Sequence, residues 1–154
     1  METEHMSSIT TSVLISIKPR YVQLILASEK TVELRKRSAQ IQPGTRVMIY
    51  STSPRRAIVG EAIIAFREQL PLPELWRRHG QDAAVTLEEF NDYYAGADQG
   101  VAFGLEGVQR YPQAVSLDTL RDLGDGFRPP QSYMRIPSLV EQLIAHLVPL
   151  PAHS

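Results

Sequence analysis

The stretch Ser28-Glu-Lys-Thr-Val-Glu-Leu-Arg35 decides the fold, because its side chains change character at every second position. Apolar Val32 and Leu34 alternate with polar residues, as in a β-strand that buries one face. The pattern predicts a strand over residues 30–37 whose apolar pair faces the core. The other face, turned toward solvent or into a cleft, then carries Thr31, Glu33 and Arg35.

The residues before this stretch predict a strand and a helix. Val13-Leu-Ile-Ser-Ile17 is rich in β-branched residues, which is typical of a buried strand. Pro19 suits the first turn of a helix, where its missing N–H costs nothing, and residues 21–27 place apolar side chains along one helical stripe. Lys30 therefore lies at a helix-to-strand junction, close to the polar face of the next strand.

The residues after this stretch predict further strands with helices at their flanks. Pro43-Gly44 is a turn signal, and Gly60 indicates a β-bulge or a close backbone approach. The proline-rich run 127–134 is expected to form a structured loop that leads to a sheet edge. Strands are expected over residues 46–50, 57–66 and 101–108, and helical elements over 72–79, 86–96, 117–123 and 138–147.

Length and composition are those of one globular domain. The 154 residues, 43% hydrophobic and 21% charged, allow one core and are few for two. We expect one domain over residues 13–148, with flexible ends at 1–12 and 149–154. The polar N-terminus lacks the apolar core of a signal peptide, and no stretch reaches the roughly 18–20 apolar residues of a membrane span. Since the chain has no cysteine, the sequence favours a cytoplasmic protein.

The formal net charge of −1 hides a segregation of charge along the chain. Residues 18–56 contain nine basic and two acidic side chains, about +7, whereas residues 61–125 contain twelve acidic and five basic ones, about −7. A local field of this kind can attract an anion to a nearly neutral molecule. The alternative is a solvated basic face without a partner.

No motif in the sequence points to a bound metal or cofactor, and we expect neither. The four histidines are scattered, and no two have the i, i+4 spacing of helical zinc ligands. A Gly-x-Ser-x-Gly elbow, a phosphate-binding glycine loop and a dinucleotide fingerprint are all missing. Trp76 lies in a predicted amphipathic helix and is expected in the core.

Four segments of the chain resemble the ASCH family, whose hallmark is a Gly- or Ser-Glu-Lys-Thr-x-Glu-x-Arg run after the first helix. The segments are SEKTVELRKR (28–37), PGTRVMIYSTSP (43–54), AIVGEAII (57–64) and RPPQSY (128–133). The resemblance implies an α+β fold, a PUA-like mixed β-barrel with flanking helices. It also implies a cleft for RNA or a nucleobase, lined by the motif strand and the first helix.

One branch of that family is similar to metal-independent amidohydrolases that deacylate N4-acetylcytidine with a lysine, a threonine and a glutamate. Lys30 matches the lysine, but Glu33 stands where that branch has its threonine. Thr31 is a hydroxyl on the same strand face at another position. The distal glutamate has no clear match, and the candidates are Glu61, Glu68 and Glu74. Other branches are linked to ribonuclease activity.

A module that binds RNA or a modified nucleoside is the favoured function. Phosphates would be held by basic side chains, a base would stack on a tyrosine, and hydroxyl and amide groups would bond to a base edge or a 2′-OH. Glu33 belongs to this set. The other residues are Lys18, Arg20, Lys30, Arg35, Arg37, Tyr50, Ser51, Thr52, Ser53, Arg55, Arg56, Gln131, Ser132 and Tyr133.

Two other functions stay open. One is a small hydrolase, an amidohydrolase or ribonuclease, with Lys30 as base or electrophile, Glu33 activating water and Thr31 beside them. The other is a DNA-binding regulator that uses the helices between residues 72 and 95. It is disfavoured because the acidic side chains there, Glu88, Glu89 and Asp92, would repel phosphates. No feature of the sequence indicates an oligomeric state.

Overall fold

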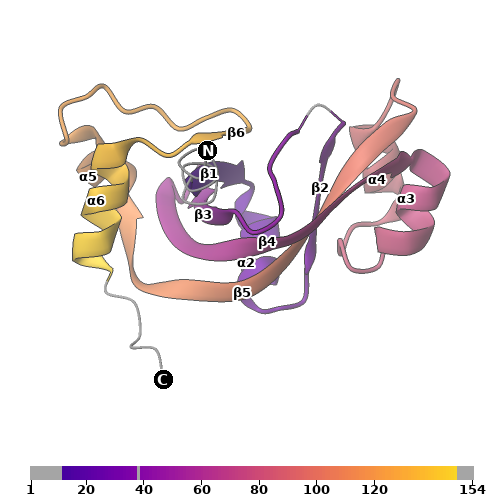
Figure 1. Cartoon of the computed structure of the whole chain (residues 1–154), viewed down its shortest axis with the longest axis horizontal. Helices are drawn as coiled ribbons and strands as arrows, with labels where there is room; N and C mark the ends of the chain where they lie inside the picture. Colours follow the sequence, from indigo (N-terminus) through magenta and orange to yellow (C-terminus); the bar gives the residue numbers. More distant parts are fainter. Residues whose placement is uncertain (1–11, 38, 149–154) are drawn as a thin grey trace, which may run out of the picture.

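The computed structural model describes residues 12–37 and 39–148, which form one curled sheet with helices on both faces (Figure 1). The elements are β1 (Ser12–Ile17), α2 (Pro19–Leu26), β2 (Val32–Lys36), β3 (Arg46–Ser51), β4 (Ala57–Pro71), α3 (Leu72–His79), α4 (Leu87–Tyr93), β5 (Gln99–Ser116), α5 (Leu117–Arg121), β6 (Tyr133–Arg135) and α6 (Ser138–Leu147). The predicted α+β class with flanking helices is confirmed, and the sheet is a half-barrel. The predicted flexible ends lie outside the described residues, except that Ser12 begins β1. None of the described helices is long and apolar enough to span a bilayer.

Six strands form the sheet in the order β2-β5-β4-β3-β1-β6. β1 and β3 run parallel, and the other pairings in the described residues are antiparallel. β6 pairs with β1 at one edge of the sheet, so the proline-rich run leads to an edge as predicted. β2 is the opposite edge.

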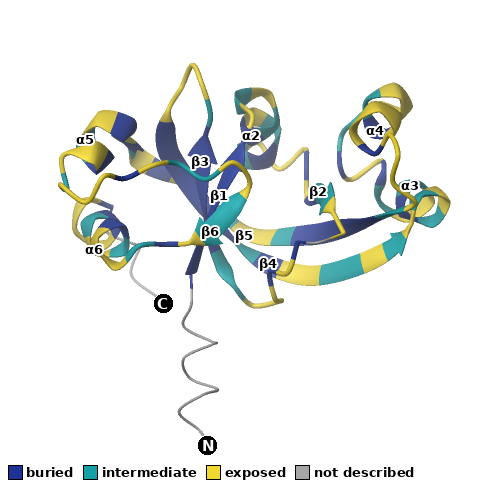
Figure 2. Cartoon of the chain, turned by 90° about the horizontal axis from the view of Figure 1, so that it is seen from above, coloured by how far each residue is buried: buried dark blue, intermediate teal, exposed yellow. Residues whose placement is uncertain are grey.

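β4 and β5 are long strands that serve two parts of the molecule. At one end they complete the half-barrel. At the other end, residues 66–71 of β4 and 99–104 of β5 extend beside α3 and α4 as a two-stranded arm (Figure 1, Figure 2). Both are longer than predicted, because their backbone ladder continues from Ala57↔Ser116 to Pro71↔Gln99 while many of the side chains become polar. The pairing shifts register around Gly60, which confirms the predicted bulge.

Two apolar clusters cover the two faces of the half-barrel. The first includes Ile15 of β1 and Ile25 of α2. The second includes Leu14 of β1 and Ile144 of α6. Neighbouring residues of β1 thus point to opposite faces, and all six of its residues are buried.

A third apolar cluster packs α3 and α4 against the arm. Leu75, Phe90 and Tyr94 are buried in it, together with Val32 of β2, and Leu34 packs at its border. The predicted inward face of β2 is therefore confirmed. Trp76, predicted in the core, is partly buried and packs against this cluster, with its ring 5.2 Å from that of Phe90.

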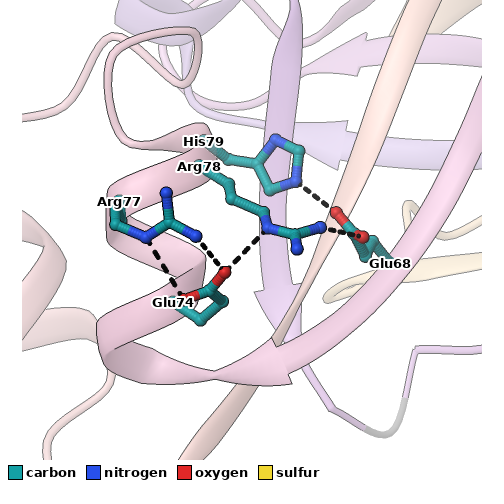
Figure 3. Close-up of polar contacts among 5 residues, drawn as sticks. All are labelled: Glu68, Glu74, Arg77, Arg78 and His79. Atoms are coloured by element: carbon teal, nitrogen blue, oxygen red, sulfur yellow. Dashed lines mark hydrogen bonds and ion pairs between the residues drawn. The ribbon is translucent and has the colours of Figure 1, made fainter.

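An ion-pair network fastens α3 to β4 (Figure 3). The Glu68 carboxylate lies 2.9 Å from Arg78 Nη1 and 2.7 Å from His79 Nε2. Arg78 Nε donates to Glu74 at 2.8 Å, and Arg77 pairs with the same carboxylate. The contacts of Glu68 link β4 to α3 on the outer side of the arm.

Gly60→Ala is expected to lower the free energy of unfolding by about 1–3 kcal/mol, because overpacking strains a close-packed site. A Cβ at this position would lie 2.5 Å from the Gln109 carbonyl oxygen, which the β4–β5 ladder holds in place. Gly104→Ala is the matched control. Its methyl would meet the ring of Phe66, a side chain that is 37% exposed, and no backbone atom. Urea denaturation measures both losses, and a loss at Gly104 equal to that at Gly60 would contradict this account of the bulge.

Candidate functional site

A cleft of about 870 Å³ lies between α2, β2 and α4 and reaches the loop before β6. Figure 2 shows α2 and α4 on the same side of the sheet, with β2 between them. Polar and aromatic side chains from distant parts of the chain line it. They are Ser16, Ile17, Lys18, Arg20, Tyr21, Lys30, Glu33, Leu34, Arg35, Lys36, Thr52, Val85, Glu89, Phe90, Asp92, Tyr93, Tyr94, Gln131 and Ser132.

The floor of the cleft is a buried carboxylate, that of Glu33 on β2. Arg35 Nε donates to Glu33 Oε2 at 2.9 Å, and Arg35 Nη2 lies 2.8 Å from the same oxygen. Lys30 Nζ lies 3.5 Å from Oε1. A charge buried this deeply is stable only with such partners. Within the described residues Oε1 has no shorter polar contact, so it keeps an acceptor position for a ligand.

Lys30 is a buried lysine whose amine contacts the Ala83 carbonyl as well as the Glu33 carboxylate. It is 2% exposed, Nζ donates to the Ala83 carbonyl at 2.6 Å, and it lies 4.9 Å from the centroid of the Tyr21 ring. Burial lowers the pKa of Lys30, and the Glu33 carboxylate opposes this by raising it. Burial dominates, so the Lys30 amine gives up its proton more readily than an exposed lysine.

Arg35 bridges the two edges of the half-barrel. From β2 at one edge, Nη2 donates to the Ser16 carbonyl of β1 at 2.8 Å, and Nη1 donates to Ser132 Oγ at 3.0 Å. Ser16 in turn donates through Oγ to the Pro130 carbonyl at 2.7 Å and through N–H to the Ser132 carbonyl at 2.9 Å. One guanidinium thereby positions the loop before β6 against the motif strand.

Aromatic side chains form one wall of the cleft. Tyr94 OH donates to the Arg35 carbonyl at 2.8 Å, and burial raises the pKa of Tyr94. Tyr93 is 42% exposed, and Lys36 Nζ lies 4.2 Å from its ring centroid. An exposed ring beside hydrogen-bonding groups is suited to stacking with a planar ligand.

The cleft brings together eight of the residues predicted to bind a ligand. They are Lys18, Arg20, Lys30, Glu33, Arg35, Thr52, Gln131 and Ser132. Thr31, the third predicted catalytic residue, is exposed and lies outside the cleft lining. The arrangement thus centres on Lys30, Glu33 and Arg35.

The other predicted residues lie elsewhere. Tyr50 is 3% exposed in the second apolar cluster, so its ring is unavailable for stacking, and Ser51 beside it is also buried. The reason is that β3 is a central strand covered on both faces. Tyr133 packs on the first cluster and accepts a hydrogen bond from the Gln40 N–H at 3.0 Å. Four exposed residues lie outside the lining: Arg37, Ser53, Arg55 and Arg56.

Several lining residues were not predicted. Ser16 is the last residue but one of the predicted first strand, and Tyr21 lies on the predicted helical stripe just before Lys30, so the sequence already placed both near the predicted cleft. The wall residues of α4 carry no such signal, because only the extended arm brings them opposite β2.

The three candidates for a distal glutamate all lie outside the cleft lining. Glu61 is buried, accepts hydrogen bonds from Arg46 at 3.0 and 2.8 Å, and accepts a third from Tyr111 OH at 2.8 Å. Glu68 and Glu74 belong to the ion-pair network between β4 and α3 (Figure 3). The carboxylate that faces Lys30 is therefore Glu33. Among the described residues, no three His, Asp or Glu side chains gather as a metal site would require.

The cleft is much less basic than the charge segregation of the sequence predicts. Five basic side chains line it, Lys18, Arg20, Lys30, Arg35 and Lys36, against three acidic ones, Glu33, Glu89 and Asp92, which leaves about +2. Glu33 pairs with two of the bases and Glu89 with Arg20. The site therefore offers directed hydrogen bonds more than a broad positive field.

The chain is similar in sequence and in structure to several known proteins. It matches a family model described as a domain of unknown function (DUF365) over residues 10–124. The ASCH domain-containing ribonuclease of Zymomonas mobilis is 32% identical over 118 residues, 77% of this chain and 79% of that protein. A crystal structure of ASCH from Zymomonas mobilis has a TM-score of 0.83 and 29% identity, covering 89% of this chain and 95% of that one. Human THYN1, crystallised with DNA containing 5-methylcytosine, shares the fold alone, with a TM-score of 0.58 at 9% identity over 93% and 100% of the two chains.

The pKa of Lys30 is expected to lie below 10.5, the ordinary value for lysine, because the effect of burial outweighs the attraction of the Glu33 carboxylate. NMR of isotope-labelled lysine side chains measures this, and Lys30→Arg identifies the signal. Glu33→Gln should lower the pKa further, since it removes the opposing charge and keeps the shape. A pKa at or above 10.5, or one that rises in Glu33→Gln, would contradict this picture of the site.

Proposed function

The chain belongs to the ASCH domain family, and we propose that its cleft binds RNA with one base seated over the Glu33 carboxylate. The observation that carries this proposal is the buried pair at the cleft floor, where an acceptor oxygen of Glu33 lies 3.5 Å from the Lys30 amine. Bases carry adjacent donor and acceptor groups on their edges, and a neighbouring acceptor and donor complement them.

The relatives support RNA as the class of ligand. The Zymomonas mobilis protein is named a ribonuclease, and 79% of its length aligns with this chain. The family match over residues 10–124 includes Lys30, Glu33 and Arg35. A fold alone does not imply function. The support therefore comes from the 32% identity to the Zymomonas mobilis protein, together with the carboxylate of Glu33 and the amine of Lys30 at the cleft floor.

The size and lining of the cleft suit one unstacked nucleotide. A volume of about 870 Å³ falls in the range of pockets that enclose small ligands. Thr52, Gln131 and Ser132 offer hydroxyl and amide groups, and the aromatic wall lines the same cleft. Proteins that recognise single-stranded RNA combine such groups with aromatic side chains that stack on splayed-out bases.

Phosphates of neighbouring nucleotides would lie outside the cleft. Arg55 and Arg56 are exposed in the turn between β3 and β4. Their backbone N–H groups donate to the carbonyl of Thr52 at 3.0 and 3.4 Å. Since Thr52 also lines the cleft, this turn extends from its rim. Both arginines are therefore suited to bind the backbone of an RNA whose base occupies the cleft.

Affinity for single-stranded RNA is expected to fall steeply with salt, with a slope of about −0.7 per phosphate contact. The double variant Arg55→Ala/Arg56→Ala should weaken binding to every RNA sequence and lessen that slope, at a nearly unchanged Tm. Arg77→Ala, on the outer side of α3, is the matched control and should leave binding unchanged (Figure 3). Fluorescence anisotropy with labelled RNA of mixed sequence measures the affinities. Binding that is independent of salt, or a large loss of Tm in the double variant, would count against the phosphate role.

RNA cleavage is a second candidate function, favoured by the lowered pKa of Lys30 and by the ribonuclease among the relatives. A neutral Lys30 amine would take the proton of a 2′-OH, and the 2′ oxygen would attack the adjacent phosphorus. The bond from phosphorus to the 5′ oxygen would then break. This oxygen would take a proton from water, and the hydroxide left behind would take back the proton held by Lys30. The products are a 2′,3′-cyclic phosphate and a 5′-hydroxyl end, with Arg35 stabilising the charge that develops.

Lys30→Arg separates binding from cleavage, because it keeps a cation and removes the base. If the chain cleaves RNA, the variant should still bind it and cleave at least a hundredfold more slowly, in line with the usual contribution of a general base, about 10²–10⁴-fold. Gel analysis of labelled RNA, with the product ends identified by mass spectrometry, measures this. N4-acetylcytidine, the substrate of the alternative amidohydrolase, is expected to stay intact. Undiminished cleavage by Lys30→Arg would exclude Lys30 as the base.

A further inference from the structure

An ion pair crosses the mouth of the cleft. Arg20 of α2 pairs with Glu89 of α4, and both side chains line the cleft from opposite sides. The two helices stand on the same side of the sheet in Figure 2. Both partners remain accessible, with side-chain exposures of 61% and 30%, so a solute can reach either of them.

The carboxylate of Glu89 is held in place by its own helix. Its Oε1 accepts the N–H of Thr86 at 2.8 Å, and Thr86 Oγ1 accepts the N–H of Glu89 at 3.1 Å, a reciprocal capping box. These backbone bonds, followed by Arg20, lower the pKa of Glu89. Its Oε2 is left to face Arg20 as a fixed anion.

Arg20 also contacts Tyr21, a residue of its own helix, in addition to Glu89. Its guanidinium carbon lies 4.8 Å from the centroid of the Tyr21 ring, and Nη2 lies 3.4 Å from Tyr21 OH. Lys18, at the cap of the same helix, lines the cleft as a second cation. A planar guanidinium fork binds carboxylates and phosphates in the same way.

We propose that Arg20 and Lys18 form a phosphate subsite at the cleft mouth, and that Glu89 occupies this subsite in the free protein. The inference rests on the proposed function, since the phosphate belongs to the nucleotide whose base fills the cleft. A bound phosphate displaces the Glu89 carboxylate from Arg20. Asp92, which lines the same side of the cleft, adds negative charge there. The subsite therefore favours one phosphate delivered by a seated base over free phosphate.

Glu89→Gln tests this subsite without loss of the helix cap, because a Gln oxygen can still accept the Thr86 N–H. The probes are the four ribonucleosides and their 5′- and 3′-monophosphates, measured by isothermal titration calorimetry on the full chain. The readout is the affinity of each monophosphate divided by that of its nucleoside. Removing a competing surface ion pair should raise this ratio about two- to fivefold, and Arg20→Gln should lower it.

Glu88→Gln is the matched control, since Glu88 lies in the same helical turn outside the cleft lining, and it should leave the ratio unchanged. Arg20→Gln removes the cation of the same ion pair, and it leaves the capping box of α4 unchanged because Thr86 and Glu89 are both retained. If nucleosides or RNA bind but the ratio stays the same or falls in Glu89→Gln, the subsite is overturned and the proposed function stands. If neither RNA nor any nucleoside or nucleotide binds, the proposed function and the subsite fall together.

Discussion

The guanidinium of Arg35 bonds at once to the Glu33 carboxylate, the Ser16 carbonyl and the Ser132 hydroxyl. Glu33 lies on one edge strand of the half-barrel, and the two serines belong to β1 and the loop at the opposite edge. A buried carboxylate is costly without cationic partners, so Glu33 requires both Arg35 and Lys30. Meeting this requirement draws the edges of the sheet together and leaves a polar cleft where they meet.

The alternation of residues around Glu33 predicted correctly which side chains of β2 face the core and which turn away from it, because the direction of side chains along a strand is a local property. Val32 faces the core and Glu33 faces the cleft, as the pattern indicates. The aromatic wall could not be predicted in the same way. Tyr93 reaches the cleft only because β4 and β5 continue as an arm past Phe66, where polar residues hide the strand from a search for apolar alternation.

Charge and position in the chain were poorer guides than alternation. Arg37, Arg55 and Arg56 contribute to the basic segment of the sequence, yet the fold places them outside the cleft lining. Tyr50 ends a strand that lies in the middle of the sheet, so its ring is buried where the sequence predicted a stacking surface. Local runs of charge or aromatic residues do not specify which strands will be central, since strand order depends on contacts between distant segments.

A nucleotide seated at the floor of the cleft would contact the same residues that bridge the two edges of the sheet. The most direct measurement is an NMR titration of the isotope-labelled chain with single-stranded RNA, following each backbone amide. The account predicts the largest shifts at Ser16, Glu33, Arg35 and Ser132, with little change at Ile144 on the opposite face. Shifts confined to α5 and α6, with the amides around Glu33 unmoved, would contradict it.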